Sequence, residues 1–465
     1  MKRKTWVRLD NASNIFLAAM TNRDTKVFRL TAEMTSIVDP KLLQKALDKT
    51  YEQYLLYHSV LRRGVFWYYL VMSDLKPKVV AETLPPCSPL YHFDQKELLF
   101  RVIYQENRIH LEVFHVLSDG IGAMWFFEDL IKEYVYLRVH EIAENKWEKT
   151  PLQIEQQLED SFNQHFRQEG QNTFSNAARS AFFSVVKTSK QAGKVVVKYS
   201  KKTSSWFGSS ASIESNKKRV YQIKNKKTPD NRPRVVDLSV PLKETLQLAK
   251  EQQVSLTIYL IALFFESIRK AETNFKQTDT IAISVPVNLR QFYQSNSARN
   301  FFSTVLLEYT YSGEEEEFNH LCMSLSKQLH DHLEPERLSQ RLSKLIKAEY
   351  HPIARISLRP FKDMILKLIN RQNNRKVTVA MSNLGQFALP YPMNTYIKQV
   401  YFKTSAVRPQ FCMISYEDSL TISFTSPFID VAIQKEFSRF LSEAGLPVSI
   451  AVNQVTTAEL GGESG

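Results

Sequence analysis

A run from His115 to Gly120 has the pattern His-x-x-x-Asp-Gly, whose side chains could carry out proton transfer. A histidine near its ordinary pKa can accept a proton from an attacking hydroxyl or amine and return it to a leaving thiolate. This exchange requires an imidazole whose tautomer and ring angle are fixed. His115 is therefore a candidate general base.

The elements around this run could hold the imidazole in place. Two strands are predicted over 98–104 and 109–115 as a hairpin, and a helix is predicted from Asp119 to residue 137. His115 then ends its strand, and Gly120 supplies the permissive backbone that a tight strand-to-helix corner often needs. A structural histidine beside an Asp helix cap is the alternative interpretation, and the motif alone does not exclude it.

Both halves of the chain mix strands and helices. At 465 residues, the chain is too long for a single hydrophobic core of ordinary size and is suited to two halves packed together. We predict an N-terminal half over 1–150, a helical and basic connecting segment over 151–231, and a C-terminal half over 232–465. Helices are expected over 40–51, 119–137, 242–251, 255–271, 315–329, 336–347, 353–369 and 433–444. Strands are expected over 26–30, 65–71, 79–80, 98–104, 109–115, 235–240, 280–286, 302–309, 377–381, 396–402, 411–415 and 420–424.

The formal net charge of +13 is concentrated in one segment. Twelve Lys or Arg residues and one acid, Glu214, lie between Lys187 and Lys227, so this segment carries +11 of that charge. The rest of the chain is nearly neutral. A nucleic-acid partner is therefore not expected.

Within the basic segment, five lysines fall in an arc of roughly 80° when the chain is drawn as a helix, with alanines and valines opposite. An ordinary crossover helix that places its valines on the protein is the simpler interpretation. The alternative is transient docking on an anionic membrane, which would suit a lipid-like acceptor and a peripheral location. The five residues are Lys187, Lys190, Lys194, Lys198 and Lys201.

Cysteine usage and apolar runs indicate a cytoplasmic protein. Cys87, Cys322 and Cys412 are far apart and odd in number, which excludes a disulfide framework and a Cys-x-x-Cys knuckle. The basic N-terminus has no apolar run behind it, so no secretory signal is expected. The longest apolar stretch, 256–265, is far shorter than the roughly 20 residues that span a bilayer.

Other common catalytic patterns are missing from the sequence. It contains no Gly-x-x-x-x-Gly-Lys phosphate loop and no Gly-x-Ser-x-Gly elbow. His330 and His332 are two residues apart, so on a helix they point in different directions. We therefore expect no P-loop hydrolase, no ordinary serine hydrolase and no metal site.

Several segments spread over nearly the whole chain form a set: His58–Arg62, His115–Gly120, Pro286–Arg290, Asn300–Ser303 and Ser382–Gly385. Together they resemble the acyl-CoA-dependent acyltransferases, which share the chloramphenicol-acetyltransferase fold with condensation domains, plant acyltransferases and wax ester synthases. Residues 6–12 and 64–70 are similar to the bacterial alcohol acetyltransferases, the nearest branch.

This resemblance implies an α+β fold, a two-layer α/β sandwich in which two chloramphenicol-acetyltransferase-like halves form a pseudo-dimer with a tunnel between them. Acyl-CoA, a co-substrate and not a permanently bound cofactor, would meet the acceptor at His115. His115 would be the general base for direct attack on the thioester, without a covalent enzyme intermediate. Because one chain supplies both halves of the site, we expect a monomer.

The resemblance also implies roles for residues near His115. Asp119 would turn away from the substrate and form a salt bridge with an arginine, which sets the loop geometry. Arg290 is the first choice for that partner and Arg62 the second. Ser303 and Asn383 are candidates for oxyanion donors or tunnel residues.

The sequence also departs from parts of the superfamily pattern. Phe114 stands where condensation domains carry a second histidine, which argues against peptide synthesis on carrier proteins. The Asp-Phe-Gly-Trp-Gly signature of plant enzymes is absent. We therefore predict an O-acyltransferase that moves an acyl group to an alcohol, with acetyl as the leading candidate for that group. The alternatives are a carrier-protein-dependent or lipid acyltransferase and a catalytically silent member that binds a ligand in its tunnel.

Overall fold

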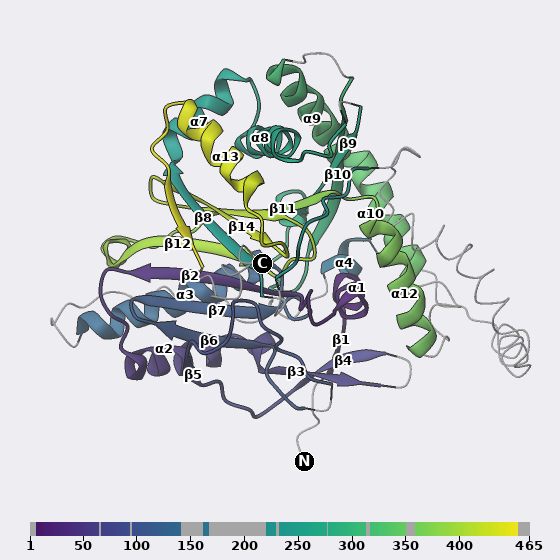
Figure 1. Cartoon of the computed structure of the whole chain (residues 1–465). Helices are drawn as coiled ribbons and strands as arrows, with labels where there is room; N and C mark the ends of the chain where they lie inside the picture. Colours follow the sequence, from purple (N-terminus) through teal and green to yellow (C-terminus); the bar gives the residue numbers. More distant parts are fainter. Residues whose placement is uncertain are drawn as a thin grey trace, which may run out of the picture.

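A computed structural model describes residues 6–64, 67–93, 95–140, 161–166, 220–228, 232–276, 278–312, 317–349 and 359–453 (Figure 1). The predicted basic helix face from Lys187 to Lys201 lies outside these residues. Within them, no helix combines the length and the apolar character needed to cross a membrane.

The first layer is a five-stranded sheet with the order β12-β2-β7-β6-β5. Its strands are β2 (Val27–Met34), β5 (Val79–Ala81), β6 (Phe100–Gln105), β7 (Arg108–Phe114) and β12 (Ile397–Thr404). Two helices, α2 (Pro40–Gln53) and α3 (Gly120–His140), pack against each other and on this sheet (Figure 1). Pro40 occupies the first turn of α2, and the Asp39 side chain caps the helix by accepting from the Lys41 N–H at 2.8 Å.

The second layer is a seven-stranded sheet with the order β10-β9-β11-β13-β14-β8-β15. Its strands are β8 (Arg234–Pro241), β9 (Thr280–Asn288), β10 (Phe302–Thr310), β11 (Val379–Gln386), β13 (Gln410–Tyr416), β14 (Ser419–Ser426) and β15 (Ser449–Val452). The helices α7 (Leu242–Glu251), α8 (Leu256–Ala271), α9 (Phe318–Leu333) and α13 (Ala432–Glu443) lie above this sheet in Figure 1. Every residue of α8 from Ile258 to Ile268 is buried, as expected of a helix that is covered on all sides.

The remaining elements lie around these two layers. A small sheet has the order β1-β4-β3, from β1 (Trp6–Arg8), β3 (Ser59–Arg63) and β4 (Tyr68–Met72). The other α-helices are α1 (Asn11–Ala19), α4 (Ser161–Phe166), α10 (Pro335–Glu349) and α12 (Arg359–Asn374), and α12 packs against α1. Short 3-10 helices are η1 (Leu55–His58), η2 (Leu289–Gln291) and η3 (Met393–Tyr396).

The strand β12 joins the two layers. It comes from the later half of the chain, yet it pairs antiparallel with β2, with Phe402 opposite Leu30. Its other contacts are with β13 and β14, and Lys403 Nζ lies 2.9 Å from Asp237 Oδ2 of β8. The later half of the chain thus completes the sheet that carries His115.

Every predicted helix and strand that falls within the described residues is present, with ends that differ by a few residues. The prediction missed β1, β3, β15 and α1. The helix α1 has nine residues, too short for a stable helix by propensity alone, so its sequence carries little periodic signal. Its N-cap is Asp10, which accepts from the Ser13 N–H at 2.7 Å.

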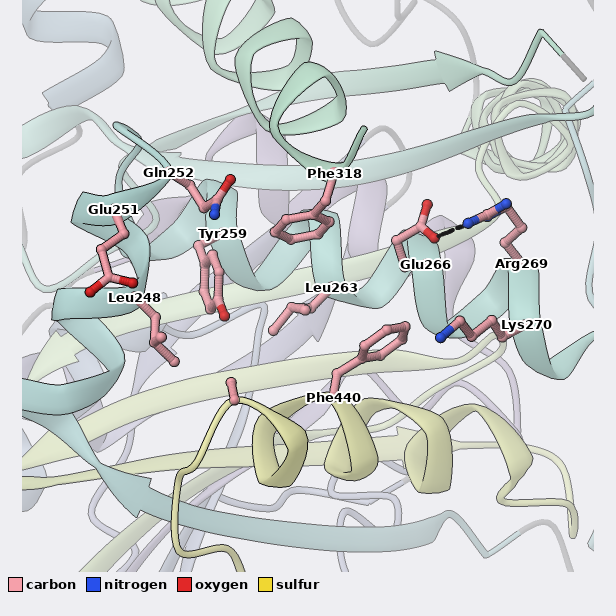
Figure 2. A pocket seen from close by; sticks show the side chains of 11 residues that line it. Leu248, Glu251, Gln252, Tyr259, Leu263, Glu266, Arg269, Lys270, Phe318 and Phe440 are labelled. Carbon is pink, nitrogen blue, oxygen red and sulfur yellow. Dashed lines mark hydrogen bonds and ion pairs between the residues drawn. The ribbon is translucent and has the colours of Figure 1, made fainter. Parts of the chain in front are cut away.

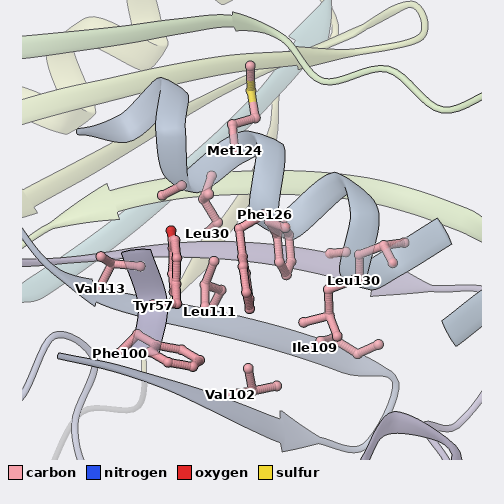
Figure 3. Close-up of a cluster of buried hydrophobic side chains, with 14 of the residues drawn as sticks. Leu30, Tyr57, Phe100, Val102, Ile109, Leu111, Val113, Met124, Phe126 and Leu130 are labelled. Carbon is pink, nitrogen blue, oxygen red and sulfur yellow. The ribbon is translucent and has the colours of Figure 1, made fainter. Parts of the chain in front are cut away.

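Phe126 of α3 tests the packing of the first layer. It is fully buried, and its ring stacks on Tyr57 with centroids 4.1 Å apart (Figure 3). Phe126→Ala leaves a cavity there, so we expect a loss of about 3–5 kcal/mol in the free energy of unfolding. Phe93→Ala, at a 61% exposed position, is the matched control, with an expected change within about 1 kcal/mol. Denaturant unfolding measures both, and equal stability of the two variants would contradict the prediction.

Candidate active site

His115 follows β7 at the point where the chain turns toward α3. Its backbone N–H donates to the Lys26 carbonyl at 2.8 Å, which extends the pairing with β2 beyond the strand. Its ring lies among Phe16 of α1, Phe28 of β2 and Phe302 of β10, with centroids 4.2, 5.1 and 5.7 Å away. The imidazole therefore lies where the sheet of the first layer meets the start of β10 from the second.

The surroundings of His115 favour a neutral ring. Burial lowers its pKa below the usual value, and the negative charge of Asp119 only partly opposes this effect. His115 Nδ1 lies 3.1 Å from Asn300 Oδ1, and the Asn300 amide donates to the His115 carbonyl at 3.0 Å. At neutral pH the imidazole is therefore uncharged and able to accept a proton.

Asp119 joins the start of α3 to a loop of the second layer. Its Oδ1 accepts from the Gly122 N–H at 2.9 Å, which caps the helix. Its Oδ2 accepts from Arg290 Nη1 at 2.7 Å and from the Phe301 N–H at 2.9 Å. Both carboxylate oxygens are therefore engaged away from the His115 ring.

The two candidate arginines lie in different places. Arg290 is buried beside Asp119, and its Nη2 also donates to the carbonyls of Ser297 and Arg299 at 2.7 and 2.8 Å. Arg62 is exposed on β3, opposite Tyr69. The structure therefore brings Asp119 together with Arg290 and not with Arg62.

Gly120 lies in a closely packed position rather than at a strained turn. Its φ is not positive, so the corner does not need the backbone freedom of glycine. A Cβ there would lie 2.4 Å from Leu384 Cδ2, and a Cβ at Gly122 would lie 2.2 Å from the Ala298 carbonyl oxygen. Both glycines let the second layer approach the start of α3 closely.

The two oxyanion candidates make no hydrogen bond to His115 in the described part of the chain. Ser303 follows Phe302 on β10, so its side chain lies on the opposite face of the strand from the ring that contacts His115. Asn383 is exposed and lies 3.2 Å from Thr257 Oγ1 of α8. The role predicted for both remains a prediction.

Sequence reasoning missed three residues that contact the His115 site. Asn300 belongs to a quoted motif, but nothing local indicated a bond to a histidine 185 positions earlier. Phe16 and Ser13 lie on α1, which was not predicted; Ser13 Oγ donates to the Val116 carbonyl at 2.9 Å. The Asp10 cap that begins α1 was the only sequence signal available.

A separate pocket of about 430 Å³ lies between α8 and α13 (Figure 2). Its lining includes Tyr259, Leu263, Phe318, Phe440 and Lys270. None of the residues that contact His115 lines it. This pocket is therefore distinct from the candidate active site.

One group on the surface has metal-type ligands. His330, Asp331 and Glu334, at the end of α9, offer ligand atoms within 4.8 Å of one another. The two-residue spacing of His330 and His332 in the sequence did not indicate this group. Glu334 is already paired with Arg337 at 2.9 Å, so we assign the group no metal.

A family model described as alcohol acetyltransferase matches residues 102–441 of the chain. No curated protein matches the chain. Among solved structures, the chain is similar to a trichothecene 15-O-acetyltransferase from Fusarium sporotrichioides, with 10% identity, a TM-score of 0.57, and coverage of 95% of this chain and 94% of the other.

Two further solved structures have the same fold. A wax ester synthase/diacylglycerol acyltransferase from Marinobacter aquaeolei VT8 has 13% identity and a TM-score of 0.53, with 94% of this chain and 100% of the other covered. The starter condensation domain of rhizomide synthetase, in complex with C8-CoA, has 12% identity and a TM-score of 0.55, with 95% of each chain covered. These similarities confirm the predicted fold class, while the tunnel remains a prediction.

The Asp119–Arg290 ion pair can be tested by removing each charge. Both side chains are less than 10% exposed, so either single variant leaves a buried charge without its partner. We expect Asp119→Ala and Arg290→Ala each to lower the free energy of unfolding by about 3–5 kcal/mol. In the double variant, the free energy of unfolding should fall by less than the sum of the losses in the two single variants, because no unpaired charge is left buried.

Arg62→Ala, at the exposed position, is the control for this cycle and should change stability by less than about 0.5 kcal/mol. Denaturant unfolding of the four proteins gives the coupling energy. Additive effects of the two single variants would show that the pair contributes nothing to the stability of the site.

Proposed function

This chain belongs to the alcohol acetyltransferase family. On that premise, we propose that it transfers an acyl group, with acetyl as the leading candidate, from acyl-CoA to an alcohol. The observation that carries the proposal is His115, an uncharged imidazole enclosed by aromatic rings where the two layers meet. The solved relative in complex with C8-CoA supports a coenzyme A thioester as the donor.

His115 would act as the general base through its Nε2. The acceptor O–H proton moves to Nε2 as the oxygen attacks the thioester carbonyl carbon, which forms the new C–O bond. The C–S bond then breaks, and the leaving thiolate takes the proton from Nε2. The products are an ester and free CoA, and the imidazole returns to its neutral state without a covalent enzyme intermediate.

The surroundings of His115 suit this sequence of steps. Phe16, Phe28 and Phe302 enclose the ring and limit the access of water, which would compete with the alcohol for the thioester. The burial that lowers the pKa of His115 also keeps its lone pair available at neutral pH. An apolar or lipid-like alcohol would fit these aromatic walls best.

The developing oxyanion needs hydrogen-bond donors near the acyl carbon. Ser303 and Asn383 remain the sequence-based candidates for this role. We propose that the donor and the acceptor meet in a tunnel between the two halves of one monomer. Membrane contact through Lys187, Lys190, Lys194, Lys198 and Lys201 would bring a lipid-like acceptor closer to that tunnel.

The first test is the release of free CoA thiol from acetyl-CoA and longer acyl-CoAs. The acceptor panel runs from ethanol to long-chain and sterol-like alcohols, and native protein is compared with His115→Ala. We expect acceptor-dependent release that falls by about two orders of magnitude or more in the variant, because the base is lost. His92→Ala, at an exposed histidine whose ring pairs with Glu97 at 2.9 Å, is the matched control and should keep the native rate.

Release that is absent, or equal in native protein and His115→Ala, would contradict the proposal. A carrier-protein thioester in place of free acyl-CoA then tests the carrier-dependent alternative. A protein that binds acyl-CoA but turns over neither donor would be a catalytically silent member.

The pH dependence follows from the lowered pKa of His115. The neutral imidazole is the active base, so kcat/KM should reach a plateau at alkaline pH and fall in acid, with an apparent pKa below the usual histidine value of about 6.5. Thiol release measured across pH 4.5–8.5, after subtraction of uncatalysed hydrolysis, gives this profile. An acid limb centred at or above about pH 6.5 would contradict the prediction of a lowered pKa.

A further inference from the structure

The buried side chain of Asn300 contacts both His115 and the start of the chain. Its Oδ1 lies 3.1 Å from His115 Nδ1. Its Nδ2 lies 3.0 Å from the His115 carbonyl, 3.1 Å from Ser13 Oγ and 3.4 Å from Asp10 Oδ2. Only 3% of Asn300 is exposed, so water cannot replace these partners.

These neighbours determine which way the amide points. The His115 carbonyl and the Asp10 carboxylate can only accept hydrogen bonds. Ser13 Oγ donates its own proton to the Val116 carbonyl at 2.9 Å, so toward Asn300 it is an acceptor as well. Three acceptors therefore surround one end of the amide, which must be the NH₂ group, and the oxygen must face the imidazole.

The orientation of the amide in turn determines the tautomer of His115. An amide oxygen has no proton to donate, so the 3.1 Å contact requires a proton on His115 Nδ1. Neutral imidazole carries one ring proton, so the lone pair is left on Nε2, the nitrogen that the proposed mechanism uses.

We infer that Asn300 is a positioning residue that holds His115 as the Nδ1–H tautomer, an inference that rests on the proposed function for its catalytic consequence. Asn300 touches no reacting atom and acts through the imidazole. A histidine with the opposite tautomer presents an N–H to the substrate alcohol and cannot take its proton.

Asn300 also links the base to the rest of the site. The next residue, Phe301, donates its N–H to Asp119 Oδ2 at 2.9 Å, and the preceding Arg299 donates from Nη2 to the Arg8 carbonyl at 2.7 Å. Arg290 holds the same loop through the Arg299 carbonyl at 2.8 Å. The later half of the chain thus positions a base that the earlier half supplies.

The test compares native protein with Asn300→Ala and Asn300→Asp. Asn300→Ala removes the acceptor for Nδ1–H, so kcat should fall by about 10–100-fold, with KM changed by less than about threefold. Asn300→Asp keeps an acceptor for Nδ1–H, but its second oxygen replaces the NH₂ group and faces the same three acceptors, Asp10 Oδ2 at 3.4 Å among them. Its negative charge beside the imidazole should raise the pKa of His115 and move the acid limb of the pH profile to higher pH. Asn319→Ala, at an exposed asparagine of α9, is the control and should change neither quantity.

A second readout does not depend on activity. In protein labelled with ¹⁵N-histidine, the ring nitrogen shifts of His115, assigned by their loss in His115→Ala, report the proton position. We expect a protonated Nδ1 in native protein and a shift toward protonated Nε2 in Asn300→Ala. The same tautomer in both, or an unchanged kcat in Asn300→Ala, would overturn the inference.

The two readouts separate this inference from the proposed function. A native protein that turns over no acyl-CoA but shows the Nδ1–H tautomer, lost in Asn300→Ala, would refute the acyl-transfer proposal and keep the positioning role. Acyl transfer that depends on His115 but not on Asn300, with an unchanged tautomer, would support the acyl-transfer proposal and refute the positioning role. If Asn300→Ala fails to fold, the ring nitrogen shifts of native His115 still test the inference, because a protonated Nε2 in native protein would overturn it.

Discussion

The buried ion pair between Asp119 and Arg290 is the interaction on which the candidate site depends. Desolvation of two charges is costly, and here the cost is offset by a 2.7 Å contact and by hydrogen bonds from the Gly122 and Phe301 backbone to the same carboxylate. The pair fixes the corner between β7 and α3 against a loop of the second layer. Because His115 lies four residues before Asp119, that corner also sets the position of the imidazole.

The site is assembled from both layers, and β12 makes their relative position hard to change. This strand pairs with β2 and also contacts β13 and β14. A shift of one sheet over the other would break its ladder with β2 or its packing on the second sheet. The small clearance at Gly122 adds a second constraint, since a Cβ there would lie 2.2 Å from the Ala298 carbonyl oxygen.

The chemistry of His115 follows from this assembly. Aromatic rings from α1, β2 and β10 desolvate the imidazole, which keeps it neutral, while Asn300 supplies a directional contact to one nitrogen. Desolvation acts on the protonation state and the hydrogen bond acts on the tautomer. Neither effect alone would give an imidazole that is both neutral and held in one orientation, which is why residues from both layers meet at this position.

The sequence by itself determined the elements and the reactive motif, because both are local. Helical periodicity in α2 and strand alternation in β7 repeat within a few residues, and the His115–Gly120 motif lies at a corner that such patterns predict. The tertiary structure decided the partners: Arg290 for Asp119 at a separation of 171 residues, Asn300 for His115 at 185, and β12 for β2. Contacts at such distances leave no periodic trace in a single sequence, since they form only when segments far apart in the chain come together in the folded protein.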